Sequence, residues 1–236
     1  MDMYTNRHMV MPGTPTTTSQ LRLWQLISPA LPVGAYAYSG GLEYAVDAGW
    51  VKTREAVQGW IGVQLREVQA RLDVPVFLRL HAACAAGDAP AQHRWNALLR
   101  ASRETAELRA EDAQLGAALL RLLVDLDIRP AAGLDTAAPS FALAFALAAV
   151  HWGIAARAAA EGLLWAWCEN QVAAAVKLVP LGQTDGQRLL LALGGDIEAA
   201  VTLGLSIEDE CIGASAPGVA LASALHETQY TRLFRS

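Results

Sequence analysis

Charge is what this 236-residue sequence has least of. Charged residues make up 17% of the chain and hydrophobic residues 53%, whereas an average globular domain is about 25% charged. The net charge is −5 and Lys and Arg form no cluster, which argues against nucleic-acid binding because that needs a basic footprint. With so few charged residues, a single folded chain has too little polar surface to cover its apolar interior. We therefore expect part of the surface to be buried against another subunit.

Cysteines and strand patterns are also scarce. Cys84, Cys168 and Cys211 lie far apart in apolar surroundings, so we expect reduced core cysteines of a cytoplasmic protein rather than a disulfide framework. Alternating β-branched segments bounded by turns do not occur, while Ala and Leu, which favour helices, dominate. The sequence predicts an all-α protein, a single-domain compact bundle of roughly ten helices.

No targeting or membrane segment stands out. Residues 1–19 contain all four Met and several Thr but no apolar h-region, which predicts a disordered leader rather than a signal peptide. The longest uncharged apolar run, 137–156, is mostly Ala and includes a proline and a histidine. A buried helix is favoured there, with a membrane helix as the alternative. We expect the helical domain over residues 20–225 and a tail over 226–236.

Local start and stop signals place several helices. Thr53 is expected to cap a helix that runs to about Leu72. Asp73 is then expected to cap another helix, which stops at Gly87, and Asp88 to cap the next.

Five further segments have helical composition. Residues 102–126 are the most charged part of the chain and predict an amphipathic helix whose charges are solvated. Residues 141–160 and 163–179 are apolar all round, so we expect them to be the central helices of the bundle. Short helices are expected over 187–193 and 196–205.

The stretch 21–50 is the most unusual part of the chain. After a helical start it contains two prolines, then Tyr36 and Tyr38, then a glycine pair before a second helical run. Proline cannot sit inside a helix, so the middle of the stretch must be a loop. An apolar, aromatic loop without charge is either packed beneath another element or available to a partner.

Motifs for chemistry are missing or weak. Neither phosphate-binding glycine motif occurs, so we do not expect the chain to bind a nucleotide by itself. Ser39 lies in a sequence loosely like a nucleophile elbow, but its glycine spacing is wrong and a helix cap is the favoured role. His81 and Cys84 have metal-ligand spacing, yet no third ligand is near, which favours a structural histidine. No catalytic residue and no metal ligand is predicted.

Two positively charged regions have the composition of interface anchors. Lys177 is the only cation between Glu161 and Gln187, and it either reaches solvent along an apolar helix or forms an ion pair in a complex. Arg188 can lie on the same edge. The tail combines two arginines with two aromatic residues, a composition typical of a partner contact.

Four blocks together resemble one family, the UreF urease accessory proteins. They are Ser28-Pro-Ala-Leu-Pro-Val-Gly-Ala-Tyr-Ala-Tyr-Ser-Gly-Gly-Leu-Glu43, the segment 141–153 ending in His-Trp-Gly, the segment 170–188 that begins Asn-Gln-Val-Ala and ends Asp-Gly-Gln-Arg, and the tail His-Glu-Thr-Gln-Tyr-Thr-Arg-Leu-Phe-Arg-Ser at 226–236. The blocks span nearly the whole chain after residue 20, and their order makes the resemblance specific.

The resemblance implies an all-α, homodimeric protein that is not an enzyme and needs no cofactor. Such a protein lies between UreD (also called UreH) and the GTPase UreG in the complex that delivers nickel to apo-urease. It is expected to act as a scaffold that couples GTP hydrolysis by UreG to nickel insertion. The alternative is a direct GTPase activator that supplies a catalytic residue, such as a tail arginine, in trans.

The same resemblance suggests which residues meet each partner. The UreG-facing residues would be Tyr36, Tyr38, Glu43, Lys177, Gln183 and Arg188. The UreD-facing residues would be Tyr230, Arg232, Leu233, Phe234 and Arg235, in a tail that becomes ordered on that partner. No contact with nucleic acid or membrane is expected.

Overall fold

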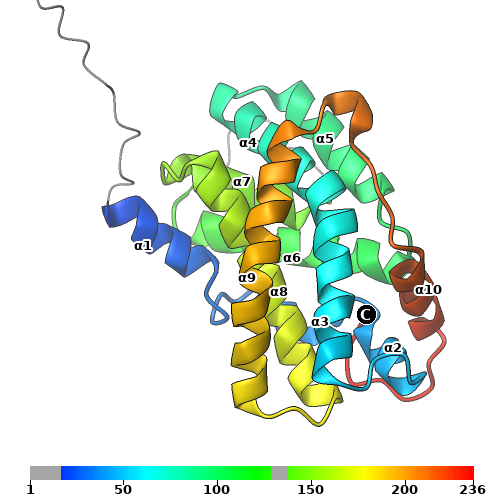
Figure 1. Cartoon of the computed structure of the whole chain (residues 1–236). Coiled ribbons are helices and arrows are strands. Elements are labelled where there is room, and N and C mark those ends of the chain that lie inside the picture. The colour runs from blue at the N-terminus through cyan, green and yellow to red at the C-terminus, as the bar shows by residue number, and fades with distance from the viewer. Residues whose placement is uncertain (1–16, 129–137) are drawn as a thin grey trace, which may run out of the picture.

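The computed structural model describes residues 17–128 and 138–236, and within these ranges it contains helices, turns and loops but no strand (Figure 1). The all-α prediction is therefore confirmed. The α-helices of the described residues are α1 (Thr17–Leu26), α2 (Leu42–Asp47), α3 (Arg54–Val63), α4 (Val74–Ala86), α5 (Ala89–Ala101), α6 (Ala106–Asp125), α7 (Phe141–His151), α8 (Ala156–Leu178), α9 (Gln183–Ser206) and α10 (Pro217–His226). A π-helix, η2 (Gln64–Asp73), joins α3 to α4, and 3₁₀ turns form at η1 (Ala35–Ala37) and η3 (Asp209–Cys211).

Helix α7 is the centre of the bundle. Residues 142–149 are all buried, and α7 packs against α4, α6 and α8. Phe145 meets Phe77 of α4 edge to face, with ring centroids 6.0 Å apart. The apolar composition thus marks a core helix, as expected, and its 11 residues are fewer than the ~20 that span a bilayer.

The break after α7 comes earlier than the sequence suggested. We expected one helix over 141–160, but α7 ends at His151 and α8 begins at Ala156. Gly153 lies in this turn with a φ of 65°, a conformation that glycine adopts without strain. Gly162 lies inside α8, where an added methyl would be 2.7 Å from Leu23 of α1. The glycine therefore lets α1 lie close against α8.

Helix α9 is continuous, and the expectation of two short helices was wrong. It runs for 24 residues through the pair Gly194-Gly195, beside α8, α3 and η2 (Figure 1). A buried face on both sides of the glycine pair keeps this part of the chain helical. The face consists of Leu189, Leu190, Leu193, Ile197, Ala200 and Val201. By length and composition alone, α9 is the one helix among the described residues that could cross a membrane. Its packing against four other helices, α3, η2, α4 and α8, makes that a weak indication.

The cap at Asp73 was also a wrong prediction. Thr53 caps α3 as expected, accepting the N–H of Ala56, and Gly87 ends α4 with a φ of 66°. Between them the chain stays helical, because Asp73 has helical dihedrals and makes no cap hydrogen bond. Its carboxylate accepts instead from Arg103, at 2.6 Å. An ion pair from a distant segment therefore replaces the local cap.

Other expectations need smaller changes. Helix α1 begins at Thr17, so the last residues assigned to the leader are helical, while residues 1–16 and most of the loop expected near 128–139 lie outside the described residues. Cys168 is buried and Cys84 half-buried, but Cys211 is exposed in η3. The expectation of three core cysteines was wrong for Cys211.

Candidate partner-binding site

The tail 226–236 packs against the chain's own loop 34–43. The N–H of Arg235 donates to the carbonyl of Ala37, and the N–H of Ser39 donates to the main-chain oxygen of Ser236, both at 2.8 Å. The hydroxyl of Ser39 donates to the same oxygen. The chain end consequently lies beside α2 and α10 (Figure 1). Two segments nearly 200 residues apart thus form one structural unit.

Glu43 is the main anchor of the tail. It lies in the first turn of α2 and is 7% exposed. Its two carboxylate oxygens accept the N–H groups of Leu233 at 2.6 Å and Phe234 at 2.8 Å. The same carboxylate faces Nε2 of His226 at 3.1 Å. Hydrogen bonds to a charged acceptor are about twice as strong as neutral ones, so this one side chain fixes the tail.

His226 connects the anchor to α6. It is fully buried, and its Nδ1 lies 2.7 Å from Glu107 while its Nε2 faces Glu43. Arg232 donates to the other oxygen of Glu107 at 2.8 Å. Each ring nitrogen of His226 therefore faces a carboxylate, and the buried imidazole links α2 to α6.

One face of α6 contacts the loop and the tail. Glu107, Glu111 and Gln114 follow one another at helical spacing. Glu111 accepts from the hydroxyl of Ser236 at 2.7 Å, and Gln114 accepts from the hydroxyl of Tyr38. The expectation that the charges of 102–126 are solvated was therefore wrong for this face. Periodicity identifies the face, but it cannot show that the tail covers it.

The loop also comes close to α10. Gly41 has a φ of 83°, and a methyl group there would lie 2.8 Å from the main-chain nitrogen of Ser223. Ser223 is itself buried and hydrogen-bonded to Thr105, the cap of α6, at 2.8 Å. The glycine is therefore needed both for the backbone conformation and for the close approach of α10.

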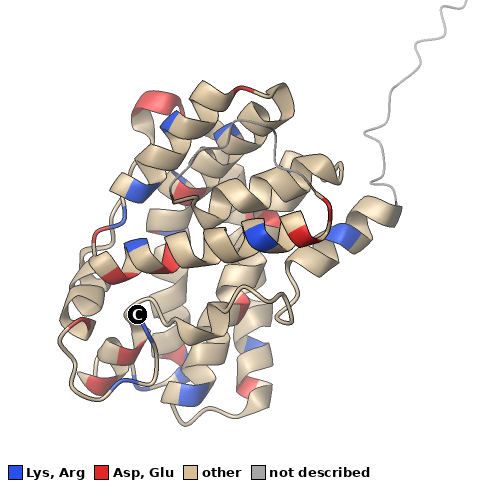
Figure 2. Cartoon of the chain, turned by 180° about the vertical axis from the view of Figure 1, so that it is seen from behind, with Lys and Arg blue, Asp and Glu red and all other residues tan. Residues whose placement is uncertain are grey.

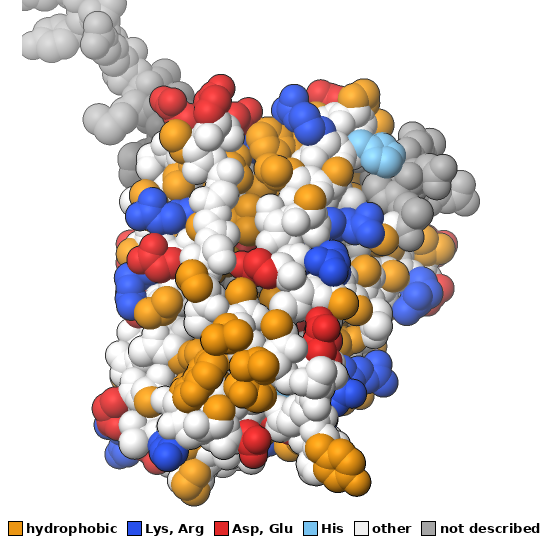
Figure 3. Space-filling view, turned by 90° about the vertical axis from the view of Figure 1, so that its right-hand side faces the viewer, with side chains coloured by type: hydrophobic (Ala, Val, Ile, Leu, Met, Phe, Trp, Pro, Cys, Tyr) orange, Lys and Arg blue, Asp and Glu red, His pale blue; other side chains and the backbone are white. Residues whose placement is uncertain are grey.

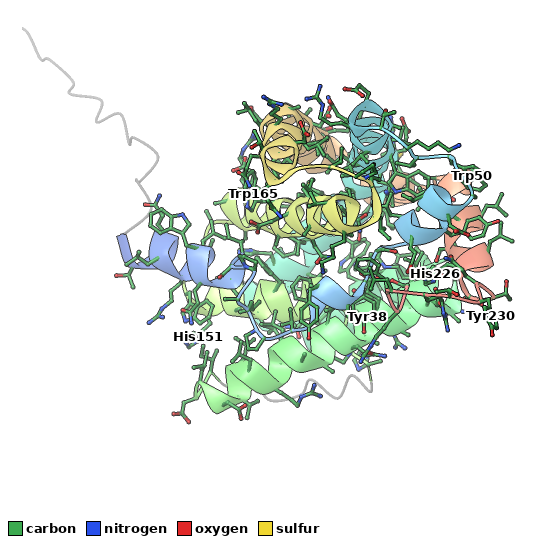
Figure 4. The ribbon with its side chains drawn as sticks, turned by 90° about the horizontal axis from the view of Figure 1, so that it is seen from below. Tyr38, Trp50, His151, Trp165, His226 and Tyr230 are labelled. Atoms are coloured by element: carbon green, nitrogen blue, oxygen red, sulfur yellow. The ribbon has the colours of Figure 1, made fainter. Side chains whose placement is uncertain are left out.

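The residues expected to face UreG do not share one environment. Tyr36 is 72% exposed, whereas Tyr38 is 4% exposed and Glu43 is buried under the tail. In the single chain these two side chains hold the tail rather than face solvent. Figure 4 shows Tyr38 and His226 in the interior beside α6, while Tyr230 lies at the outer edge.

The edge between α8 and α9 is exposed, and one of its residues, Lys177, lies close to the tail. The ammonium of Lys177 lies 5.5 Å from the ring centroid of Phe234. Gln183 is exposed. Arg188 pairs with Asp185 at 3.1 Å. Because Lys177 contacts the tail, the two groups of residues assigned to different partners are neighbours.

Of the residues expected to face UreD, only Phe234 is buried and the others are exposed. Tyr230 and Leu233 are exposed and Phe234 is 5% exposed. Arg232 pairs with Glu107 and Arg235 is exposed. We expected a partner to order this tail, but it is already packed on its own chain. That UreD adds contacts to the exposed side chains stays a prediction.

A second polar cluster lies behind the loop and lines a cavity of about 270 Å³. Arg103 reaches Asp73 at 2.6 Å and Asp112 at 3.8 Å. Both aspartates are buried, and Asp112 also accepts the N–H of Phe141 at the start of α7. The cluster therefore joins η2, α6 and α7.

Ser39 and His81, the side chains weighed for chemistry in the sequence, both make structural hydrogen bonds. The hydroxyl of Ser39 donates to a main-chain oxygen and accepts the N–H of Glu43, which is a structural role close to the cap we expected. His81 bonds to the carbonyl of Ile154 at 3.0 Å. In the part of the chain that the structure describes, no group of three or more His, Cys, Asp or Glu side chains could hold a metal ion.

Glu111 makes the stability of this region depend on pH. Burial raises the pKa of Glu111 to about 7, despite the hydroxyl of Ser236 and the positive charge of Arg103, which lower it. A raised carboxyl pKa means that the folded chain binds the proton more tightly than the unfolded chain. The stability contributed by Glu111 is therefore full below about pH 4.5 and falls as the pH rises through about 7.

We expect Glu111→Gln to remove this fall, which can reach about 3 kcal/mol. The amide cannot ionise, yet it still accepts a hydrogen bond from Ser236. Urea unfolding at several pH values between about 5 and about 8 measures the effect, and the variant should gain stability over wild type toward the alkaline end. Glu67→Gln, at an exposed position, is the control. The control should keep the pH dependence of wild type, and the prediction fails if Glu111→Gln keeps it too.

Known proteins match the chain over most of its length. The sequence model of the UreF family matches residues 51–194. A urease accessory protein UreF of Alkalilimnicola ehrlichii is 57% identical over 219 residues, covering 92% of this chain and 96% of the relative. Relatives with the same name from Marinomonas and Teredinibacter turnerae are each 50% identical, and the match covers 92% of this chain and 94% and 98% of the relatives.

Proposed function

Because the chain belongs to the UreF family of urease accessory proteins, we propose that it is a scaffold of the complex that inserts nickel into apo-urease. In this proposal it binds UreD and UreG, couples GTP hydrolysis by UreG to metal delivery, and catalyses no reaction itself. Nickel is the cargo of that complex. The observation that carries the proposal is the docking of the tail beside the loop, since it gathers the residues assigned to both partners.

The exposed side chains of this region suit partner binding. Tyr36, Tyr230 and Leu233 are large and lie largely in solvent, and the main-chain N–H of Leu233 is anchored to buried Glu43. Rigid aromatic side chains are the usual energetic centres of protein interfaces. Charged residues are sparse along the chain (Figure 2), and hydrophobic side chains gather on the lower part of the face seen in Figure 3. Such surfaces favour assembly over a solitary monomer.

The proposal can be tested at Tyr36 and Tyr230 separately. We expect Tyr36→Ser to weaken binding to UreG, and Tyr230→Ser to weaken binding to UreD, with loss of urease activation in both cases. Co-purification and gel filtration of the chain with each partner measure assembly. Leu191→Ser, an equally exposed position on α9, is the control. Normal assembly and normal urease activation by both tyrosine variants would contradict these assignments.

One observation favours the alternative of a GTPase activator. Arg235 is exposed, and its main chain is fixed by the hydrogen bond to Ala37, so its side chain leaves the tail from a fixed point. An arginine supplied in trans can stabilise the charge that develops during GTP hydrolysis. If Arg235→Ala abolishes GTP turnover by UreG while gel filtration shows an intact complex, the activator function replaces the scaffold. Arg232→Ala and Lys177→Ala are the comparisons.

The proposal includes a cytoplasmic homodimer. Apolar side chains that remain exposed on α1, such as Leu21 and Trp24, provide surface that a second copy can bury. Sedimentation equilibrium should give about twice the 25.1 kDa chain mass.

A further inference from the structure

We propose that a groove along α6 binds an acidic segment of a protein partner. This rests on the proposed function, in which the chain works through assembly. The groove, here called the α6 groove, has a volume of about 400 Å³. It lies between the loop 33–38 and the middle of α6, and residues 138 and 139 line it too.

The floor of the α6 groove is made of small side chains. Ala113, Ala117 and Ala118 line it from α6 and are half-buried. Residues four apart lie on one helix face, and the nine residues from Ala113 to Arg121 span about 12 Å along the axis. Alanines leave room for the backbone of another segment to lie close to the helix. The floor therefore fits a short peptide segment better than a small ion.

The loop wall of the groove is held in place. Tyr36 and Tyr38 both line it, and the hydroxyl of Tyr38 is bonded to Gln114 of α6. The side chain of Asn170 donates to the carbonyl of Tyr38 at 3.1 Å. Tyr36 is left largely exposed above the floor. A partner entering the groove thus meets a fixed wall and an available aromatic ring, which lowers the ordering cost of binding.

Two arginines give the groove its charge. Arg121 and Arg235 line it, and neither forms an ion pair with any residue in the described ranges. Arg103, Arg188 and Arg232, by contrast, each have a carboxylate within 3.1 Å. In a chain with a net charge of −5, two unpaired cations beside one groove favour an acidic occupant.

The tail places the second arginine. Phe234 and Ser236 are buried on either side of Arg235, and the N–H of Arg235 is bonded to Ala37. Its side chain must therefore point away from the tail's buried contacts and towards the groove. Guanidinium groups bind carboxylates through two parallel hydrogen bonds, so Asp or Glu side chains on an otherwise apolar segment match the groove.

The inference is tested by changing the charge and the shape of the groove independently. Arg121→Glu reverses one charge, and Ala117→Trp fills the floor without altering charge. Arg94→Glu, at an exposed arginine of α5, is the control. Affinities of wild type and variants for purified UreD and for purified UreG are measured separately. We expect both groove variants to weaken binding to one of these partners by about tenfold or more, with the control unchanged.

The other outcomes separate the two proposals. If wild type binds UreD and UreG and neither groove variant changes either affinity, the groove inference is wrong and the proposed function stands. If wild type binds neither partner, the proposed function fails. If wild type binds inorganic phosphate and Arg121→Glu abolishes that binding, the groove belongs to a phosphorylated ligand. If the groove variants change only self-association, the groove binds a second copy of the chain. Either result overturns the inference.

Discussion

Glu43→Ala is expected to detach the tail and to lower the free energy of unfolding by about 3–5 kcal/mol. The change removes the acceptor of two backbone N–H groups, those of Leu233 and Phe234, and the carboxylate that faces buried His226. Removing one partner of a buried contact costs this much because the groups left behind stay desolvated without their acceptor. Each unpaired amide adds the cost of an unmet hydrogen bond.

Hydrogen exchange distinguishes release of the tail from general destabilisation. The amides of residues 233 and 234 should lose protection in Glu43→Ala under conditions in which α7 stays protected. Glu43→Gln keeps one acceptor oxygen and replaces the other with an NH₂ donor, so we expect an intermediate effect. Glu55→Ala, at an exposed glutamate, should change neither measurement. Unchanged protection at 233 and 234 would show that Glu43 is not the anchor.

The result also bears on the function. If the tail must be docked to present Tyr230 and Arg235, Glu43→Ala should bind UreD more weakly although it alters no exposed side chain. A tail that binds UreD only in an extended form would instead bind at least as well after release. The two outcomes therefore decide whether the docked tail is the form that meets the partner.

Local signals predicted the elements whose determinants lie within a few residues. Thr53 and Asp88 cap helices because each side chain accepts an N–H three residues later, which depends on short-range geometry alone. The run 142–149 is buried because it has no polar face to turn toward water. In both cases the neighbouring sequence contains the whole physical reason.

Distant contacts decided the elements that were predicted wrongly. Asp73 reads as a cap, but Arg103, thirty residues away, takes its carboxylate, so the helix continues through η2. The glycine pair in α9 suggested a helix end, yet the buried face on either side of the pair keeps the helix continuous. Propensity is a weak prior that tertiary packing can override.

The site was predicted in its parts but not in its arrangement. The loop and the tail were both singled out, and the structure brings them together. Tyr36 and Tyr38 are two residues apart, however, and only the fold shows that one is exposed and the other buried. His226 and the carboxylates of α6 were missed as anchors. The spacing of Glu107 and Glu111 on one helix face was the only signal available.

Removing Arg103 should lower the free energy of unfolding as much as removing Glu43 does. In this case a cation is lost and two buried carboxylates are left behind. Arg103→Met leaves Asp73 and Asp112 buried without their cation. One oxygen of each aspartate already lacks a hydrogen-bond partner in the described structure, so little remains to compensate. We expect a loss of about 3–5 kcal/mol at neutral pH. Arg66→Met, which breaks an exposed pair with Asp196, should cost less than about 1 kcal/mol.

The pH dependence of Arg103→Met identifies the cause. Burial already raises the pKa of Asp112, and the positive charge of Arg103 lowers it, so losing Arg103 must raise that pKa further. A carboxyl with a raised pKa favours the folded state at low pH; the variant should therefore recover part of its lost stability as the medium is acidified. Adding Asp73→Asn and Asp112→Asn to Arg103→Met should restore much of it at neutral pH, because no buried charge is then left unpaired. If the triple variant is as unstable as the single one in urea unfolding, packing around the Arg103 stem rather than charge holds η2, α6 and α7 together.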